Sequence, residues 1–292
     1  MPRDYVFMTD SDSDLPWQFA QEKNIPVVQM PYNIDNQEYF DDNGKSGDQH
    51  DFYEKMRKGS TPVTSLLPTA AYVEYFEPVL EKSDLLFVAF SGKMSATFNN
   101  VLEAQAELRQ KYPERKFVVV DTLSISFPMA ILVKQAYALY EQGAAMEAVE
   151  EWLLKNLSRA RVFVTVDDLV YLRRGGRISS TSAVVGSMLN IKPILVLTKL
   201  GKLEALTKVQ GTKKAMKFML ESILSNIEDP ADQEIMIFHG DALQEAETLK
   251  QMVQAKLPEA QNITIHLVGP VIGSHTGPGT LGICFMGKER TE

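Results

Sequence analysis

The chain has 292 residues, of which 45% are hydrophobic and 23% charged, so it can bury large cores, and its length favours about two domains. Its net charge of −8 argues against nucleic-acid partners, because nonspecific binding to a phosphate backbone needs a positive field. The start of the sequence lacks the apolar stretch of a signal peptide, no run reaches the ~20 apolar residues of a bilayer-spanning helix, and the single cysteine, Cys284, fits a reducing compartment. A cytoplasmic location is therefore expected.

The N-terminal part alternates apolar strands with amphipathic helices, a rhythm typical of an α/β fold with a mainly parallel sheet. Strands are predicted at residues 5–9, 25–32, 85–90 and 117–121, and helices at 16–22, 52–58, 70–82, 99–111, 129–142 and 146–157. Thr69 is expected to cap the helix that begins at Ala70, and Gly143 is expected to end the helix at 129–142. Residues 35–49 are predicted to form a polar loop.

The C-terminal part predicts a different arrangement, with a mixed sheet. A strand at residues 162–166 precedes an antiparallel hairpin of residues 194–198 and 203–208 around Gly201. A helix at 213–227, a strand at 235–239, a helix at 243–256, a strand at 263–267 and a glycine-rich tail strand follow. We place a domain boundary near Ser158, giving an N-terminal α/β domain at 1–158 and a C-terminal mixed α/β domain at 159–292.

Three carboxylates follow the first strand at alternate positions: Asp10, Asp12 and Asp14. A calcium-binding EF-hand loop is excluded, because Leu15 stands where that loop needs glycine. A magnesium-dependent phosphatase or phosphoryl-transfer enzyme could use Asp10 and Asp12, although Asp14 departs from the motif of that class. The simpler interpretation is a strand-to-helix turn in which these side chains cap the following helix.

Two loops carry hydroxyl groups ahead of helices. One contains Thr64 and Ser65, and the other contains Ser91, Gly92 and Ser95. In an α/β sheet, ligands gather at the carboxyl ends of strands, where helix N-termini offer free N–H groups, so the two loops indicate an oxyanion site. The second loop is not a phosphate-binding P-loop, because the earlier glycine of that motif is missing. Helix capping alone is the alternative for each loop.

Arg177 and His275 are candidate donors to an anion. Arg177 follows a turn that only glycine adopts readily, and its planar guanidinium fork suits a carboxylate or phosphate ligand. His275 lies in a segment rich in glycine and proline, which predicts a tight loop. No second histidine or cysteine stands near it at metal-ligand spacing, so neither zinc nor another metal is expected.

Taken in order, these motifs resemble the DegV family. The matching blocks are Thr9-Asp10-Ser11-Asp12-Ser13-Asp14-Leu15, Thr64-Ser65, Ser91-Gly92-Lys93-Met94-Ser95-Ala96-Thr97, Val119-Val120-Asp121-Thr122, Leu172-Arg173-Arg174-Gly175-Gly176-Arg177-Ile178, Ile191-Lys192-Pro193 and Gly273-Ser274-His275-Thr276-Gly277-Pro278-Gly279. The resemblance implies a two-domain α/β protein that holds one long-chain fatty acid between its domains and is not itself an enzyme. It implies no cofactor.

The resemblance further implies a separate fatty acid kinase subunit as partner, which would phosphorylate the carboxylate, and peripheral membrane contact for lipid exchange. Carried over by position, Thr64, Ser65, Ser91, Gly92, Ser95 and His275 would meet the carboxylate, with Arg177 close by. Two positions depart from the family pattern. Gly92 stands where many relatives have serine, and Gln210 where many have arginine.

Overall fold

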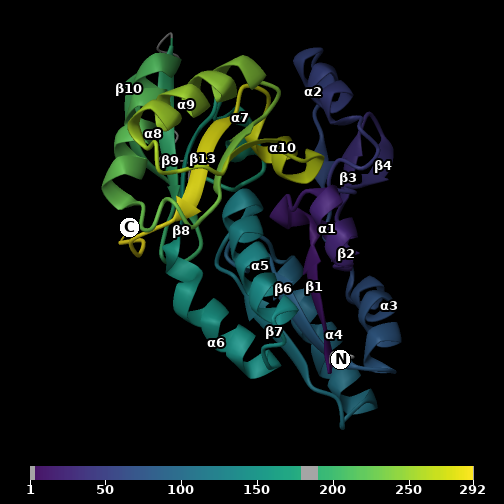
Figure 1. Cartoon of the computed structure of the whole chain (residues 1–292). Helices are drawn as coiled ribbons and strands as arrows, with labels where there is room; N and C mark the ends of the chain where they lie inside the picture. The colour runs from purple at the N-terminus through teal and green to yellow at the C-terminus, as the bar shows by residue number, and fades with distance from the viewer. Residues whose placement is uncertain (1–3, 179–189, 292) are drawn as a thin grey trace.

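The computed structural model describes residues 4–178 and 190–291. Figure 1 shows two sheets side by side, with the N-terminal strands on one side and the C-terminal strands on the other. Helix α5 (Ser126–Glu141) lies between them and packs against strands of both sheets. No helix in the described ranges is long and apolar enough to cross a bilayer.

The N-terminal sheet is parallel throughout, in the order β2-β1-β6-β7. Its strands are β1 (Tyr5–Asp10), β2 (Val27–Val28), β6 (Asp84–Ala89) and β7 (Phe117–Asp121). Helices α3 (Thr69–Leu80) and α4 (Thr97–Lys111) pack against β6 and β7, while α6 (Met146–Asn156) packs against α5 and β7. The predicted strand–helix rhythm is confirmed. Gly143, at φ +87°, takes the left-handed conformation expected after α5.

A small antiparallel sheet, absent from the sequence-based prediction, forms beside this layer. It contains β3 (Pro31–Ile34), β4 (Gln37–Phe40) and β5 (Val63–Thr64), in the order β4-β3-β5, and α2 (Gln49–Arg57) follows β4. Helix α1 (Trp17–Lys23) precedes β2. The single strand predicted at 25–32 is wrong because the chain changes sheets between β2 and β3, and the loop predicted at 35–49 contains β4.

The C-terminal sheet is mixed, in the order β10-β9-β8-β13-β11-β12. Its strands are β8 (Ala160–Thr165), β9 (Ile191–Leu197), β10 (Leu203–Gln210), β11 (Ile235–His239), β12 (Ile263–Leu267) and β13 (Leu281–Met286). Helices α8 (Thr212–Asn226) and α9 (Leu243–Lys256) pack on one side, and α5 contacts β8 and β13. The hairpin of β9 and β10 is antiparallel, as predicted, with Gly201 at φ +78°.

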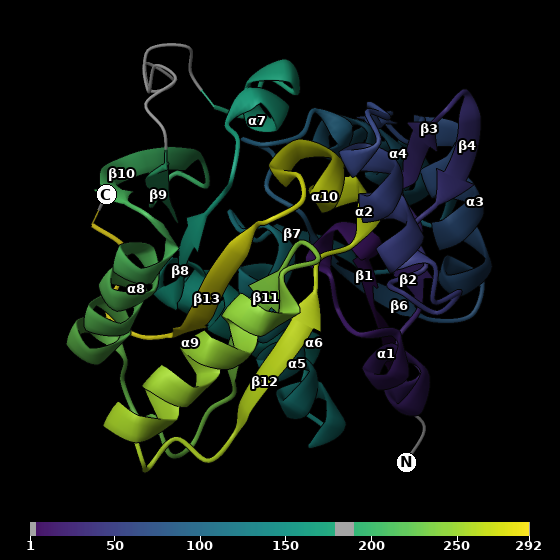
Figure 2. The ribbon, with the colours of Figure 1, turned by 90° about the horizontal axis from the view of Figure 1, so that it is seen from above.

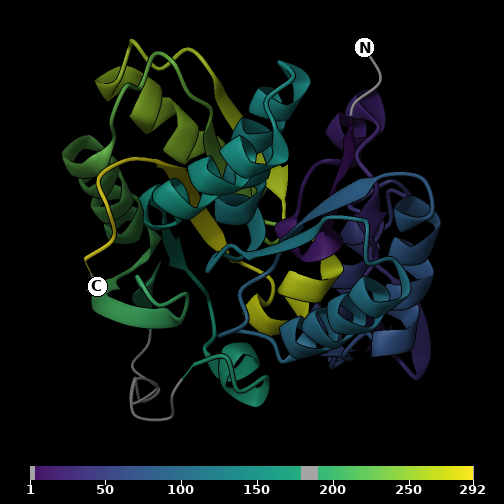
Figure 3. The same ribbon diagram turned by 90° about the horizontal axis from the view of Figure 1, so that it is seen from below.

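The glycine-rich tail is not a continuous loop and strand. It first forms a short helix, α10 (Pro270–Thr276), which packs against α7 (Val170–Arg174), α2, β3 and β5. Figures 2 and 3 show this yellow helix reaching from the C-terminal sheet to the purple and blue N-terminal segments. Residues from the two ends of the chain therefore meet at α10.

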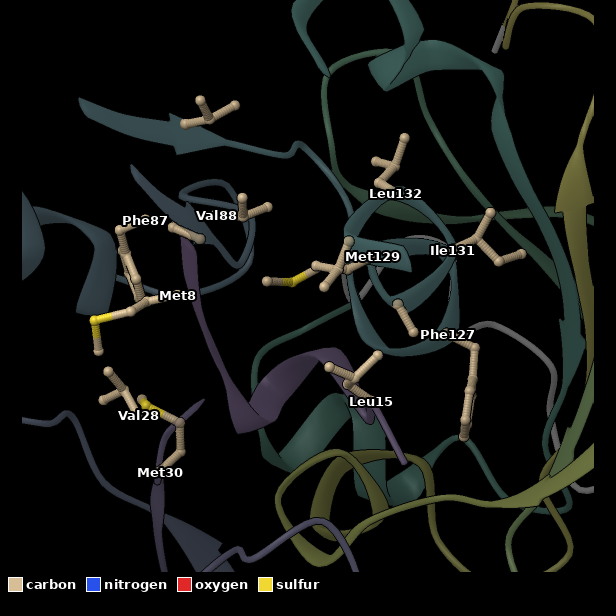
Figure 4. Packing of buried hydrophobic residues seen from close by; sticks show 14 of the residues in the cluster. Met8, Leu15, Val28, Met30, Phe87, Val88, Phe127, Met129, Ile131 and Leu132 are labelled. Atoms are coloured by element: carbon tan, nitrogen blue, oxygen red, sulfur yellow. The ribbon is translucent and has the colours of Figure 1, made fainter. Parts of the chain in front are cut away.

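One hydrophobic core runs through both parts of the molecule. Figure 4 shows Met8 and Phe87 of the parallel sheet on one side of this core and Met129 and Leu132 of α5 on the other. The same cluster includes Cys284 of β13, while a second cluster lies beneath α8 and α9. The first core contains residues from both sides of Ser158. The domain boundary near Ser158 stays a prediction.

Candidate functional site

A cavity lies where α10 meets the loops after β5 and β6 and the segment after α7. It encloses about 640 Å³ of empty space, counted with its open mouth. Its apolar lining consists of Met30, Leu66, Phe90, Met94, Ile125, Leu172, Leu203, Val271 and Ile272. Its polar lining consists of Asp12, Thr64, Ser65, Ser95, Thr97, Arg177, His275 and Thr276.

Thr64 and His275 are in direct contact in the wall of this cavity. The Thr64 hydroxyl and the His275 Nε2 share a hydrogen bond of 2.9 Å, although the residues lie far apart in the sequence. Burial, reinforced by the nearby positive charge of Arg177, lowers the pKa of His275 to about 4. At neutral pH the imidazole is therefore uncharged and has one N–H to donate.

Gly175, which is not among the predicted site residues, leaves room for this imidazole. A Cβ added at Gly175 would lie 2.2 Å from His275 Nδ1, so the histidine ring occupies the space of the missing side chain. The signal in the sequence is the glycine pair before Arg177. It was attributed to the turn alone, which accounts for Gly176 at φ +71° but not for Gly175.

Arg177 brings the positive charge to the cavity. Its Nε donates to the carbonyl of Met94 at 3.3 Å, and its Nη1 donates to the carbonyl of Gly175. Burial lowers the pKa of the guanidinium, while the negative charge of Asp12 acts in the opposite direction. Arginine stays charged over the physiological pH range, so it can neutralise an anion in this cavity.

The loop before α4 contributes two hydroxyl groups. Ser95 donates to Thr97 Oγ1 at 2.9 Å, and the backbone N–H of Thr97 donates to Ser95 Oγ at 3.2 Å. Both residues line the cavity, and Thr97 is buried. Thr97 lies within the family motif but is not among the predicted site residues. Ser65 also lines the cavity but is exposed.

Ser91 and Gly92 are not among the lining residues. The buried Ser91 hydroxyl donates to the carbonyl of Gly201 at 2.8 Å and thereby holds the tip of the β9–β10 hairpin. The backbone N–H of Gly92 points to the Asp121 carboxylate at 3.2 Å, and a Cβ at Gly92 would lie 2.9 Å from the Phe98 ring. Contact of either residue with a ligand stays a prediction.

The acidic turn after β1 is buried. Asp10 accepts a hydrogen bond from the Phe90 backbone N–H at 3.0 Å. Asp14 accepts one from the Gly269 N–H at 2.9 Å and another from the Ser126 hydroxyl. The Ser13 hydroxyl accepts a hydrogen bond from the Leu15 N–H at 3.3 Å, as the capping interpretation expects, but no side chain caps α1 itself. The carboxylates bind backbone from distant elements instead of the helix that follows them.

Burial raises the pKa of all the carboxyl groups gathered here. The pKa of Asp14 rises to about 8 and that of Asp41 to about 7, with desolvation as the main cause. Desolvation also raises the pKa values of Asp10 and Asp12, and neighbouring carboxylates raise that of Asp12 further. Among the described residues, the acidic side chains of this turn do not come together as a group that could hold a metal ion, which argues against Asp10 and Asp12 in magnesium-assisted phosphoryl transfer.

One group of possible metal ligands exists within the described residues, away from the cavity. His50 and Glu54 of α2 approach Asp241, which follows β11. Arg57 already forms ion pairs with both Glu54 and Asp241, and its positive charge opposes a cation at the same place. This arrangement ties α2 to the C-terminal part by salt bridges.

Comparison with known proteins identifies the family of this chain. The family model for uncharacterised proteins of the DegV family matches residues 6–288. The chain belongs to the DegV family. A DegV domain-containing protein of Clostridium perfringens is 37% identical over 287 residues, which are 98% of this chain and 98% of that protein.

Solved DegV structures share the whole fold. The fatty-acid-binding DegV family protein of Thermus thermophilus has 30% sequence identity and a TM-score of 0.85, covering 98% of this chain and 100% of that one. DegV of Bacillus subtilis, a fatty acid binding protein, has 25% identity and a TM-score of 0.82, covering 98% and 100%. These superpositions confirm the predicted two-domain α/β fold.

Proposed function

We propose that this DegV protein binds one long-chain fatty acid in the cavity and presents its carboxylate to a separate kinase subunit. The observation that carries the proposal is the composition of the cavity, which combines apolar walls with a cluster of uncharged donors and one arginine. Fatty acid binding by the Thermus thermophilus relative, which matches over the full chain, supports it.

The apolar walls provide the energy of binding. Burial of an acyl chain is favourable by about 0.8 kcal/mol per methylene, so most of the affinity comes from side chains such as Met94, Ile125, Leu172 and Leu203. These residues come from both parts of the molecule. The acyl chain would therefore lie between the two sheets and stabilise their contact.

The polar residues offset the cost of burying the carboxylate, which would otherwise cancel part of the favourable binding energy. A buried carboxylate is costly by several kcal/mol unless donors satisfy it. Thr64 and His275 would donate on one side and Ser95 on another, and Arg177 would supply the compensating charge. Because His275 is neutral at pH 7, the arginine carries the charge at this end and the imidazole acts as a directional donor.

The exposed rim of the cavity supports transfer to other partners. Ser65 is exposed, and the Leu66 side chain lines the cavity while 49% exposed, so this end lies close to the surface. A kinase subunit could reach a carboxylate held here, and an apolar rim suits fatty acid exchange during contact with a membrane. Phosphorylation would then be catalysed by the partner in the cytoplasm.

The binding step is tested by fluorescence titration of delipidated protein with a polyene fatty acid, followed by displacement with unlabelled oleate. We expect saturable binding at a ratio of one per chain and competitive displacement. Binding of the methyl ester with equal affinity would contradict the carboxylate site. No displacement by oleate would contradict fatty acid binding itself.

The presentation step needs a second assay. The fatty-acid-loaded chain is mixed with a bacterial fatty acid kinase catalytic subunit and ATP, and acyl phosphate is trapped with hydroxylamine. We expect product only when both proteins are present. Steady ATP hydrolysis by the isolated chain, lost on Asp10→Asn, would overturn the assignment as a carrier.

A further inference from the structure

Asp12 occupies an unusual place in the cavity wall. It belongs to the short turn Ser11–Ser13 after β1 and is 5% exposed. It lines the cavity together with Ser95 and Thr97, and the same three residues also line a small adjoining pocket. Its Oδ1 has no hydrogen-bond partner among the described residues. A buried polar atom without a partner needs an explanation, and a hydrogen bond to a ligand in this cavity would supply one.

The charges around Asp12 decide which form of the carboxyl group is present. The titratable groups that face it or line the cavity with it are Asp10 of β1, Asp14 after the turn, Asp41 after β4, Tyr72 of α3, Arg177 after α7 and His275 of α10. Desolvation and three neighbouring carboxylates raise the pKa of Asp12 well above its ordinary value, and Arg177 alone among the charged groups acts against them. These effects shift Asp12 towards the neutral acid, whose O–H can donate a hydrogen bond.

We propose that Asp12 keeps its proton and donates it in a hydrogen bond to the carboxylate of the bound fatty acid. The inference rests on the proposed function and assigns to it a further positioning residue. Arg177 supplies the charge, while Asp12 contributes a donor from the side of β1, away from the Thr64–His275 pair. A carboxylic acid can donate to a carboxylate at short distance, whereas an ionised Asp12 would repel it.

The first test compares two substitutions at this position. Asparagine keeps an N–H donor in nearly the same shape, whereas leucine keeps the branched outline but replaces both polar atoms with larger methyl groups. We expect Asp12→Leu to bind cis-parinaric acid at least tenfold more weakly than Asp12→Asn at pH 6. Equal affinities for the two variants would overturn the inference. A more than tenfold gain for Asp12→Asn over the unmodified chain would also overturn it, because it would show that Asp12 had been an ionised competitor.

The second test needs no substitution and stays informative if a variant misfolds. Affinities of the unmodified chain for palmitate and for hexadecanol are compared at pH 6 and pH 9 by displacement of the fluorescent probe. Rising pH removes protons from the carboxyl cluster around Asp12, where the pKa values of Asp10, Asp14 and Asp41 are about 7, 8 and 7. The palmitate affinity should therefore fall at least tenfold more than that of the uncharged alcohol. An equal fall for both ligands, or none for palmitate, would overturn the inference.

Different results would refute the proposed function and the role of Asp12. A chain that binds no fatty acid at either pH would refute the proposed function itself. Fatty acid binding with the same pH profile as alcohol binding, and with equal affinities for Asp12→Asn and Asp12→Leu, would leave the carrier function intact and remove only Asp12 from the carboxylate site.

Discussion

The loops at Thr64 and Ser91 have similar sequences and different surroundings. Each places hydroxyl groups between a strand and a helix, and both were predicted to meet an anion. In the structure Thr64 bonds to His275 in the cavity, while Ser91 is buried against the hairpin at Gly201. A hydroxyl-rich loop in the sequence therefore indicates where a strand ends. Whether its hydroxyl groups line the cavity depends on which residue of the C-terminal part contacts them.

The largest effect on fatty acid binding is expected from Gly175→Ala, which displaces His275, the hydrogen-bond partner of Thr64, and leaves Thr64 itself unchanged. The new methyl group would displace the His275 ring, since its Cβ position lies 2.2 Å from Nδ1. Overpacking of this kind costs about 1–3 kcal/mol, and the loss of an aligned imidazole adds to it in ligand binding. Thermal melting and fatty acid titration should both show the loss.

The control for this prediction is the double variant with His275→Ala. With the ring absent, the added methyl group has nothing to displace, so Gly175→Ala should then be nearly neutral for stability. An equal loss of stability in the presence and absence of the histidine would show that strain elsewhere is responsible.

Thr64→Val should weaken fatty acid binding while leaving the fold almost unchanged. The substitution keeps the branched shape and removes the hydroxyl that faces His275. Loss of a hydrogen bond to a charged ligand is worth roughly 1.5–3 kcal/mol, or about 10- to 150-fold in the dissociation constant. An unchanged dissociation constant would exclude Thr64 from the carboxylate site.

Ser91→Ala should give the opposite profile. The Gly201 carbonyl would lose its buried donor, which is expected to lower the free energy of unfolding by about 1–3 kcal/mol. Urea denaturation measures this loss, and the fatty acid titration should change less than for Thr64→Val. A large loss of affinity with normal stability would instead restore the predicted ligand contact of Ser91.

Ser65→Ala should have the smallest effect of the series. Its side chain lies at the exposed rim, where water replaces a lost hydrogen bond at little cost. We expect the dissociation constant to rise less than about fivefold. A change as large as that of Thr64→Val would mean that the rim closes over the ligand and excludes water from Ser65.

Elements with a strong local signal were predicted correctly. Hydrophobic periodicity located β11, α9 and β12, and a glycine flanked by apolar strands located the β9–β10 hairpin. The tail was misjudged because glycine and proline favour loops locally. Helix α10 forms through tertiary contact: a Cβ at Gly273 would lie 2.6 Å from the Tyr53 hydroxyl, so glycine is what permits the helix to approach α2.

The site was predicted in part for the same reason. The cavity is lined by four of the expected donors, Thr64, Ser95, Arg177 and His275, whose contact with a ligand stays a prediction. The buried state of Asp12 could not be predicted, because an aspartate between serines is typical of an exposed turn. Distant elements close over this turn, including the backbone of Gly269, whose N–H donates to Asp14.

The central claim is that this cavity holds a fatty acid, and native mass spectrometry of protein purified from cells tests it most directly. The account predicts an added mass that corresponds to one long-chain fatty acid per chain, confirmed by lipid extraction, with lower occupancy in Thr64→Val than in Ser65→Ala. A chain that carries no lipid from the cell, and takes up none when incubated with palmitate or oleate, would contradict the account.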